Sequence, residues 1–165
     1  MIILGIDPGY AIVGWGVLDY NGVKFKTIAY GAINTTADMK FSSRLEHIYD
    51  TISHIIAKYN PDCVAIEKLF FQNNQKTAID VGQARGVILL SAQKARLEIN
   101  EYTPLQVKQS VVGYGRAEKR QVMEMTRAIL NLKEVPKPDD TADALAIAIC
   151  HGHSAGSLYT KIKKG

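Results

Sequence analysis

The chain has 165 residues, a length that fits a single domain. Its 47% hydrophobic and 22% charged residues are ordinary for a globular protein, and two cysteines are too few for a disulfide scaffold. No uncharged apolar stretch reaches the ~18 residues of a membrane span and the N-terminus lacks the basic region of a signal peptide, so we expect a cytoplasmic protein with no membrane partner. A net charge of +4 permits a nucleic-acid partner without requiring one.

The N-terminal part of the chain predicts an antiparallel meander. We expect three strands here, at residues 2–7, 12–20 and 23–33. The first is a short apolar run that ends at Asp7, and the third alternates apolar with charged residues. Between the second and third strands, Asn21-Gly22 is a strong signal for a hairpin turn.

Helices and strands then alternate. Apolar residues recur every three or four positions in 41–59, which predicts an amphipathic helix. The further elements that we expect are a strand at 63–67, an irregular loop at 68–76, a helix at 77–97, a strand at 98–102 and helices at 104–111, 117–130 and 140–151. This order indicates an α/β fold with a mixed sheet and helices on both faces. We expect one domain at residues 1–153 and a short basic C-terminal tail at 154–165.

The helix at 77–97 is apolar on more than one face. Such a helix is usually buried on two sides, so it is either central to the fold or packs against a second copy of the chain.

The cysteines and the last two histidines have structural explanations. Cys63 and Cys150 lie in apolar runs, which predicts buried free thiols rather than a disulfide or a zinc site. His151 and His153 lie at the end of the last expected helix, where interaction with the helix C-terminus explains them. We assign no catalytic role to any histidine.

Four carboxylates adjoin apolar runs. Asp7 and Glu67 close the first and fourth strands, and Asp140 and Asp143 open the last helix. Each has an ordinary explanation: Asp7-Pro8-Gly9 is a good turn sequence, Glu67 could be a solvated strand end, and the last two aspartates could cap the helix.

Together the same carboxylates predict a metal site. The C-terminal ends of neighbouring parallel strands lie side by side, and Asp140 and Asp143 share a helix face. Oxygen ligands without a nearby histidine or cysteine favour magnesium or manganese, and two such ions ~3.5–4 Å apart could clamp a phosphodiester. Asp139 is a rival for Asp140, and we give it the capping role.

Basic and aromatic residues surround this predicted site. A basic stretch flanks the flexible Gly113-Tyr114-Gly115 and suits phosphate contact, although a solvated helix end explains each cation singly. Its members are Lys108, Arg116, Lys119 and Arg120. Phe70 and Phe71 follow Glu67 in a polar loop, and we expect one of them to be exposed and able to stack on bases.

The chain resembles the RuvC family of Holliday-junction resolvases over essentially its full length. The resemblance rests on Gly5–Gly9 (GIDPG), Ile66–Phe70 (IEKLF), Gly82–Val87 (GQARGV), Val107–Gly113 (VKQSVVG), Ala117–Lys119 (AEK) and Asp140–Ala146 (DTADALA). The order and spacing of these motifs make the set specific.

The resemblance implies a ribonuclease H-like fold and a homodimer that makes paired symmetric nicks in a four-way DNA junction during recombination and repair. It implies that Asp7, Glu67, Asp140 and Asp143 bind two Mg²⁺ ions per subunit, with Mn²⁺ as a substitute. It also implies that Phe70 contacts bases and that Lys108 and Lys119 serve DNA binding and catalysis. The partners that it implies are a junction-binding protein and a branch-migration motor of the RuvA and RuvB type.

Three other functions compete with this interpretation. An ATP-binding protein of the actin and sugar-kinase type also begins with a strand, an aspartate turn and a hairpin, but it needs a second related lobe. A related nuclease could act on RNA or on other DNA forms. A catalytically silent junction-binding module is the third, and the intact set of carboxylates argues against it.

Overall fold

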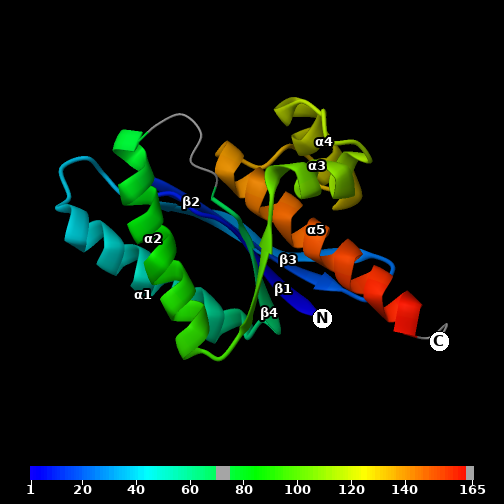
Figure 1. Ribbon diagram of the computed structural model, residues 1–165, viewed down its shortest axis with the longest axis horizontal. Coiled ribbons are helices and arrows are strands. Elements are labelled where there is room, and N and C mark those ends of the chain that lie inside the picture. Colours follow the sequence, from blue (N-terminus) through cyan, green and yellow to red (C-terminus); the bar gives the residue numbers. More distant parts are fainter. Residues whose placement is uncertain (70–74, 163–165) are drawn as a thin grey trace.

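A five-stranded mixed sheet forms the centre of the protein (Figure 1). The structure is a computed structural model that describes residues 1–69 and 75–162, with side chains described for 1–69 and 77–155. The strands are β1 (Ile2–Asp7), β2 (Ile12–Tyr20), β3 (Phe25–Asn34), β4 (Cys63–Glu67) and β5 (Glu98–Tyr102). Their order is β3-β2-β1-β4-β5, with β3, β2 and β1 antiparallel and β1, β4 and β5 parallel.

Helices cover both faces of this sheet. They are α1 (Phe41–Tyr59), α2 (Gln75–Lys94), α3 (Pro104–Val112), α4 (Lys119–Ile129) and α5 (Asp139–Ile162). Figure 1 shows α1 and α2 on one side of the sheet and α5, with α3 and α4 beyond it, on the other. Because alternate strand residues point to opposite faces, Ile3 packs with the α5 layer and Leu4 with the α1 layer. This confirms the predicted α/β fold with a mixed sheet.

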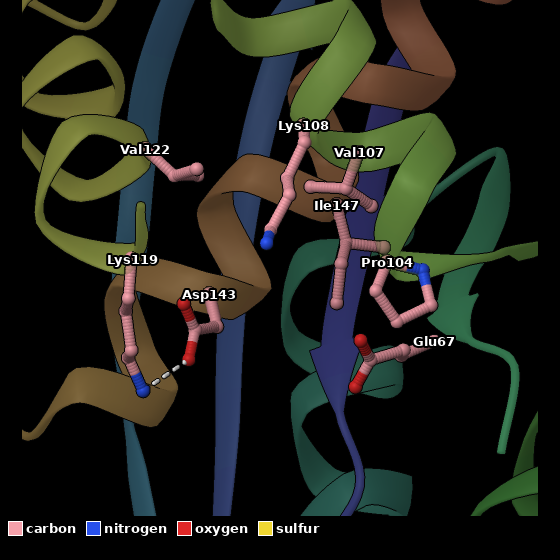
Figure 2. A pocket seen from close by; sticks show the side chains of 8 residues that line it. All are labelled: Glu67, Pro104, Val107, Lys108, Lys119, Val122, Asp143 and Ile147. Atoms are coloured by element: carbon pink, nitrogen blue, oxygen red, sulfur yellow. Dashed lines mark ion pairs between the residues drawn. The ribbon is translucent and has the colours of Figure 1, made fainter. Parts of the chain in front are cut away.

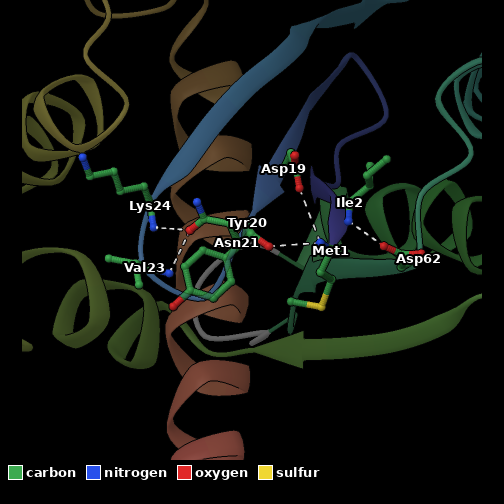
Figure 3. Close-up of polar contacts among 8 residues, drawn as sticks. All are labelled: Met1, Ile2, Asp19, Tyr20, Asn21, Val23, Lys24 and Asp62. Atoms are coloured by element: carbon green, nitrogen blue, oxygen red, sulfur yellow. Dashed lines mark hydrogen bonds and ion pairs between the residues drawn. The ribbon is translucent and has the colours of Figure 1, made fainter.

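The first strand is anchored at its start by polar contacts (Figure 3). The Met1 amino group pairs with the Asp19 carboxylate at 3.4 Å and donates to the Tyr20 carbonyl at 3.0 Å. The Ile2 amide donates to Asp62 Oδ2 at 2.6 Å. These contacts hold the start of β1 between the end of β2 and the start of β4.

Several predicted boundaries are confirmed to the residue, and the hairpin differs slightly. The confirmed ranges are 2–7, 12–20, 41–59, 63–67 and 98–102. The third strand begins at Phe25 because Asn21 Oδ1 accepts hydrogen bonds from the amides of Val23 and Lys24, which closes a four-residue loop. Gly22 supplies the positive φ of 94° that this turn needs.

Helix ends differ where local backbone geometry decides them. We expected α2 at 77–97, but it begins at Gln75 and ends at Lys94, since Arg96 adopts a left-handed φ of 57°. We expected a helix from 117, but α4 begins at Lys119 because Glu118 caps it through a capping box with Gln121. No helix in the described ranges is both long enough and apolar enough to cross a membrane.

The last helix is longer than predicted. Gly152 does not end it; instead the Phe25 ring lies where a Cβ of residue 152 would be, so this glycine allows close packing. Ser154 Oγ donates back to the Cys150 carbonyl at 2.8 Å, and the helix continues to Ile162. Residues 154–162 therefore continue α5 rather than follow it. The division of the chain into a domain at 1–153 and a tail at 154–165 stays a prediction.

This extension changes the explanation of His151. The side chain is buried, with Nδ1 2.8 Å from the Tyr102 hydroxyl and Nε2 3.2 Å from Cys63 Sγ. The prediction that His151 and His153 interact with the helix C-terminus was wrong, because the helix ends eleven residues after His151. The predicted buried free thiols of Cys63 and Cys150 are confirmed.

Candidate active site

Two strand ends and one helix start meet at one edge of the sheet. Ile6 pairs with Ile66 in parallel register, so Asp7 and Glu67 follow as neighbours at the C-terminal ends of β1 and β4. The first turns of α5 cross β2 in direct contact with its backbone: a Cβ on Gly14 would collide with the Asp140 carbonyl. The missing side chain at Gly14 therefore allows α5 to bring its acidic first turns close to this edge.

Electrostatics show that the four carboxylates are neighbours. Burial, followed by the negative charges of Glu67, Asp143 and Asp140, raises the pKa of Asp7 to about 8. Burial and the Asp143 charge also raise the pKa of Glu67, although a hydrogen bond with Asp7 opposes this. The structure thus brings together all four carboxylates that the sequence singled out, and like charges accumulate around Asp7.

Lys119 is the cation that partly neutralises this cluster. Its Nζ lies 2.9 Å from Asp143 Oδ2 and 3.5 Å from Asp139 Oδ2. Burial lowers the pKa of Lys119, but the hydrogen bond and charge of Asp143, together with Asp139, outweigh burial and raise it. The prediction that Asp139 caps α5 was wrong, because Asp139 is already the first helical residue and pairs with Lys119.

A pocket of about 260 Å³ opens beside these carboxylates. In Figure 2 the side chains of Glu67, Asp143, Lys108 and Lys119 converge on this space from four different elements. Its apolar wall consists of Pro104, Val107, Val122 and Ile147. The sequence did not single out this wall, since Val107, Val122 and Ile147 have the helical spacing of ordinary core residues. Acidic groups, two lysines and an apolar wall suit a ligand that combines phosphate with flat apolar rings.

Comparison with known proteins decides the family. The family model described as "Crossover junction endodeoxyribonuclease RuvC" matches residues 3–151. The chain belongs to the RuvC family. A crossover junction endodeoxyribonuclease RuvC of Ruminiclostridium cellulolyticum is 61% identical over 154 residues, which are 93% of each chain.

Solved RuvC structures agree with this assignment. Thermus thermophilus RuvC is 35% identical and superposes with a TM-score of 0.89, over 96% of this chain and 97% of that one. The same protein in complex with Holliday junction substrate is 34% identical, with a TM-score of 0.86 over 94% and 95%. These matches confirm the predicted ribonuclease H-like fold.

The other residues that the sequence analysis singled out lie outside the pocket or outside the described residues. Arg116 lies in the connection between α3 and α4, and Arg120 lies in the first turn of α4; both are exposed. In the ranges with described side chains, neither has an ion pair, which leaves both available to phosphates. Phe70 and Phe71 lie outside the described residues.

The donor set fits the divalent cation that the RuvC family implies, although its arrangement is not that of a bound site. Within the described residues, no three or more His, Cys, Asp or Glu side chains are arranged to hold a metal ion. One reason is visible: Asp143 turns to Lys119. Four carboxylates against one paired lysine nevertheless form an oxygen-rich set of ligands, which suits a hard divalent cation.

Proposed function

We propose that this chain is a magnesium-dependent endonuclease that resolves four-way DNA junctions by paired symmetric nicks in recombination and repair. The observation that carries the proposal is the uncompensated carboxylate cluster around Asp7, whose pKa is raised to about 8, beside a pocket lined by two lysines. Membership of a family of crossover junction endodeoxyribonucleases, and a Thermus thermophilus relative solved with a Holliday junction, support it.

Each pocket residue has a proposed task. Asp7, Glu67, Asp140 and Asp143 would hold two Mg²⁺ ions, and Asp7 would be the central ligand because the charges of the other three act on it. When bound, such ions supply an activated water and neutralise charge on the phosphodiester. Lys119 would release Asp143 and pair with a phosphate oxygen instead, and Lys108 would contact the backbone beside it.

Cations outside the pocket would extend the DNA-binding surface. Arg116 and Arg120 are exposed and belong to the same α3–α4 segment of the chain as Lys108 and Lys119. We propose phosphate contacts for both, and base contacts for Phe70 on the strength of the family resemblance alone. Because each phosphate contact releases counterions, removing one of these arginines should flatten the salt dependence of junction binding.

The outer face of α2 supports a homodimer. Ile79, Gly82, Gly86 and Leu90 are spaced three or four residues apart, and Ile79 and Leu90 are 67% and 51% exposed. A Cβ on either glycine would have no neighbour within 4 Å in the described part of the chain. Glycine inside a helix costs about 1 kcal/mol relative to alanine, so these glycines make sense if another surface approaches closely. We propose that a second copy of the chain does so.

Sedimentation tests the dimer. We expect wild type to be a dimer at micromolar concentration and Leu90→Asp to be a monomer. Val23→Asp is the matched control, since Val23 is an even more exposed apolar residue (82%) that lies in the β2–β3 loop. If both variants dissociated into monomers, or if neither did, this face of α2 would not be the dimer interface.

Partners of the RuvA and RuvB type remain a proposal that rests on the resemblance.

Cleavage of a labelled four-way junction tests the activity. The assay compares the junction with a linear duplex of the same sequence, with Mg²⁺ and with chelator. The proposal predicts symmetric nicks in opposing strands of the junction only, and only with Mg²⁺. Equal cutting of both substrates would leave a nuclease without junction specificity, and binding without cutting would favour the silent module.

A further inference from the structure

Arg85 of α2 reaches across to the ends of two neighbouring strands. Its Nη2 pairs with Glu101 Oε2 of β5 at 2.5 Å, and its Nε donates a long hydrogen bond of 3.4 Å to the carbonyl oxygen of Glu67. The Arg85 side chain is only 14% exposed, whereas that of Glu101 is 46% exposed. A largely buried guanidinium therefore joins β4 and β5 at the residue whose carboxylate lines the pocket.

This contact lies at the C-terminal end of β4, where its pairing with β5 ends. Glu67 pairs with Tyr102, and the Lys68 amide donates to the Tyr102 carbonyl at 2.8 Å. β4 ends at Glu67, two residues before the end of this described range at Leu69. A donor on the Glu67 carbonyl restricts the peptide plane that follows the Glu67 Cα, and this plane helps to set the direction in which the carboxylate points.

We infer that Arg85 is a positioning residue that holds Glu67 in its working orientation and is itself oriented by Glu101. The inference rests on the proposed function of Glu67. It also gives α2 a second task, because the helix that exposes Ile79 and Leu90 on its outer face would then fix one wall of the pocket. Arg85 entered the sequence analysis only within the GQARGV motif, and nothing in its spacing revealed a contact with residue 67.

Two substitutions separate positioning from simple stabilisation. Arg85→Gln and Glu101→Gln both abolish the ion pair, but only Arg85→Gln removes the charged donor to the Glu67 carbonyl. Because a misplacement of about 1 Å can cost about 100-fold in rate, we expect Arg85→Gln to lower kcat for junction cleavage about 10- to 100-fold. Glu101→Gln should lower kcat less, and both variants should bind the junction within about twofold of wild type.

Arg127→Gln is the matched control. Arg127 also joins one carboxylate and one carbonyl, those of Glu124 and Leu132, but it lies on α4. Its loss should change kcat within about twofold. The inference would be overturned if Arg85→Gln and Glu101→Gln lowered kcat equally and lowered the midpoint of thermal unfolding in parallel. The ion pair would then act only through stability.

Amide hydrogen exchange gives a readout that needs neither DNA nor metal. The Lys68 amide should exchange faster in Arg85→Gln than in wild type and stay unchanged in Arg127→Gln. Unchanged exchange in Arg85→Gln would overturn the inference even if kcat falls. If wild type itself does not cut junctions, the proposed function fails, while the exchange result still decides whether Arg85 orders the end of β4.

Discussion

The two ends of β4 bury polar groups in opposite ways. At its start, Cys63 contacts His151, which also bonds the Tyr102 hydroxyl. Burial lowers the pKa of His151, raises that of Cys63 to about 12 and raises that of Tyr102, so all three stay neutral and satisfy one another. At its end, Glu67 meets Asp7 and further carboxylates, and Lys119 compensates only part of their charge.

The difference shows what distinguishes a functional cluster from a structural one. Burial and shifted pKa values occur at both ends of the strand, so neither marks the site. What marks it is charge that the described part of the protein leaves uncompensated, since such charge destabilises the fold unless a ligand neutralises it. The predictions below alter one of the two clusters at a time.

The largest expected effect follows from Asp7→Asn. The substitution keeps the shape of the side chain but removes the carboxylate that would bind Mg²⁺ at the centre of the cluster, so junction cleavage with Mg²⁺ should fall by several orders of magnitude. Junction binding should be retained, because the substitution adds no negative charge that would repel phosphate. Cleavage and gel-shift assays on the same labelled junction measure both quantities. Mg²⁺-dependent cleavage at the wild-type rate would exclude Asp7 from the reaction.

A smaller effect is expected from Lys119→Gln. Loss of a charged donor at the pocket should slow cleavage about a hundredfold. Burial raises the pKa of Asp143 and Lys119 opposes this rise, so without Lys119 that pKa rises further and the Asp143 carboxylate forms only at higher pH. The pH–rate profile of cleavage should therefore move to higher pH.

Arg120→Gln is the control for this substitution, because Arg120 is the next residue along the chain and is exposed. Its pH–rate profile should match that of wild type. An unshifted profile for Lys119→Gln would mean that the ion pair with Asp143 does not affect the reaction.

The structural end of β4 predicts the smallest effect on activity. His151→Phe leaves the Tyr102 hydroxyl without its partner and should lower the free energy of unfolding by about 1–3 kcal/mol. The rate of cleavage should be unchanged at temperatures well below the midpoint of thermal unfolding. His151→Phe/Tyr102→Phe should cost less than the single variant, since both partners are then apolar. Urea unfolding measures both. A cleavage defect at full folding would assign His151 a functional role.

Sequence reasoning found the carboxylates because strand ends follow from local patterns. Asp7 and Glu67 close apolar runs of two strands that the structure pairs in parallel, so their proximity follows from the topology alone. The pairing of Lys119 with Asp143 depends on how α4 packs against α5, which no local pattern contains. The same holds for Gly152, which looks like a helix end until Phe25 is seen to pack on it.

Thermal unfolding as a function of pH, with Mg²⁺ or with chelator, tests the accumulation of carboxylates around Asp7 most directly. An acid whose pKa is raised to about 8 by folding stabilises the fold at low pH, and this contribution is lost as the pH rises through about 8. Without metal, the midpoint of Asp7→Asn should therefore increasingly exceed that of wild type between pH 4 and 8, and Mg²⁺ should reduce this difference by binding wild type. A difference that is constant with pH and unaffected by Mg²⁺ would contradict the account.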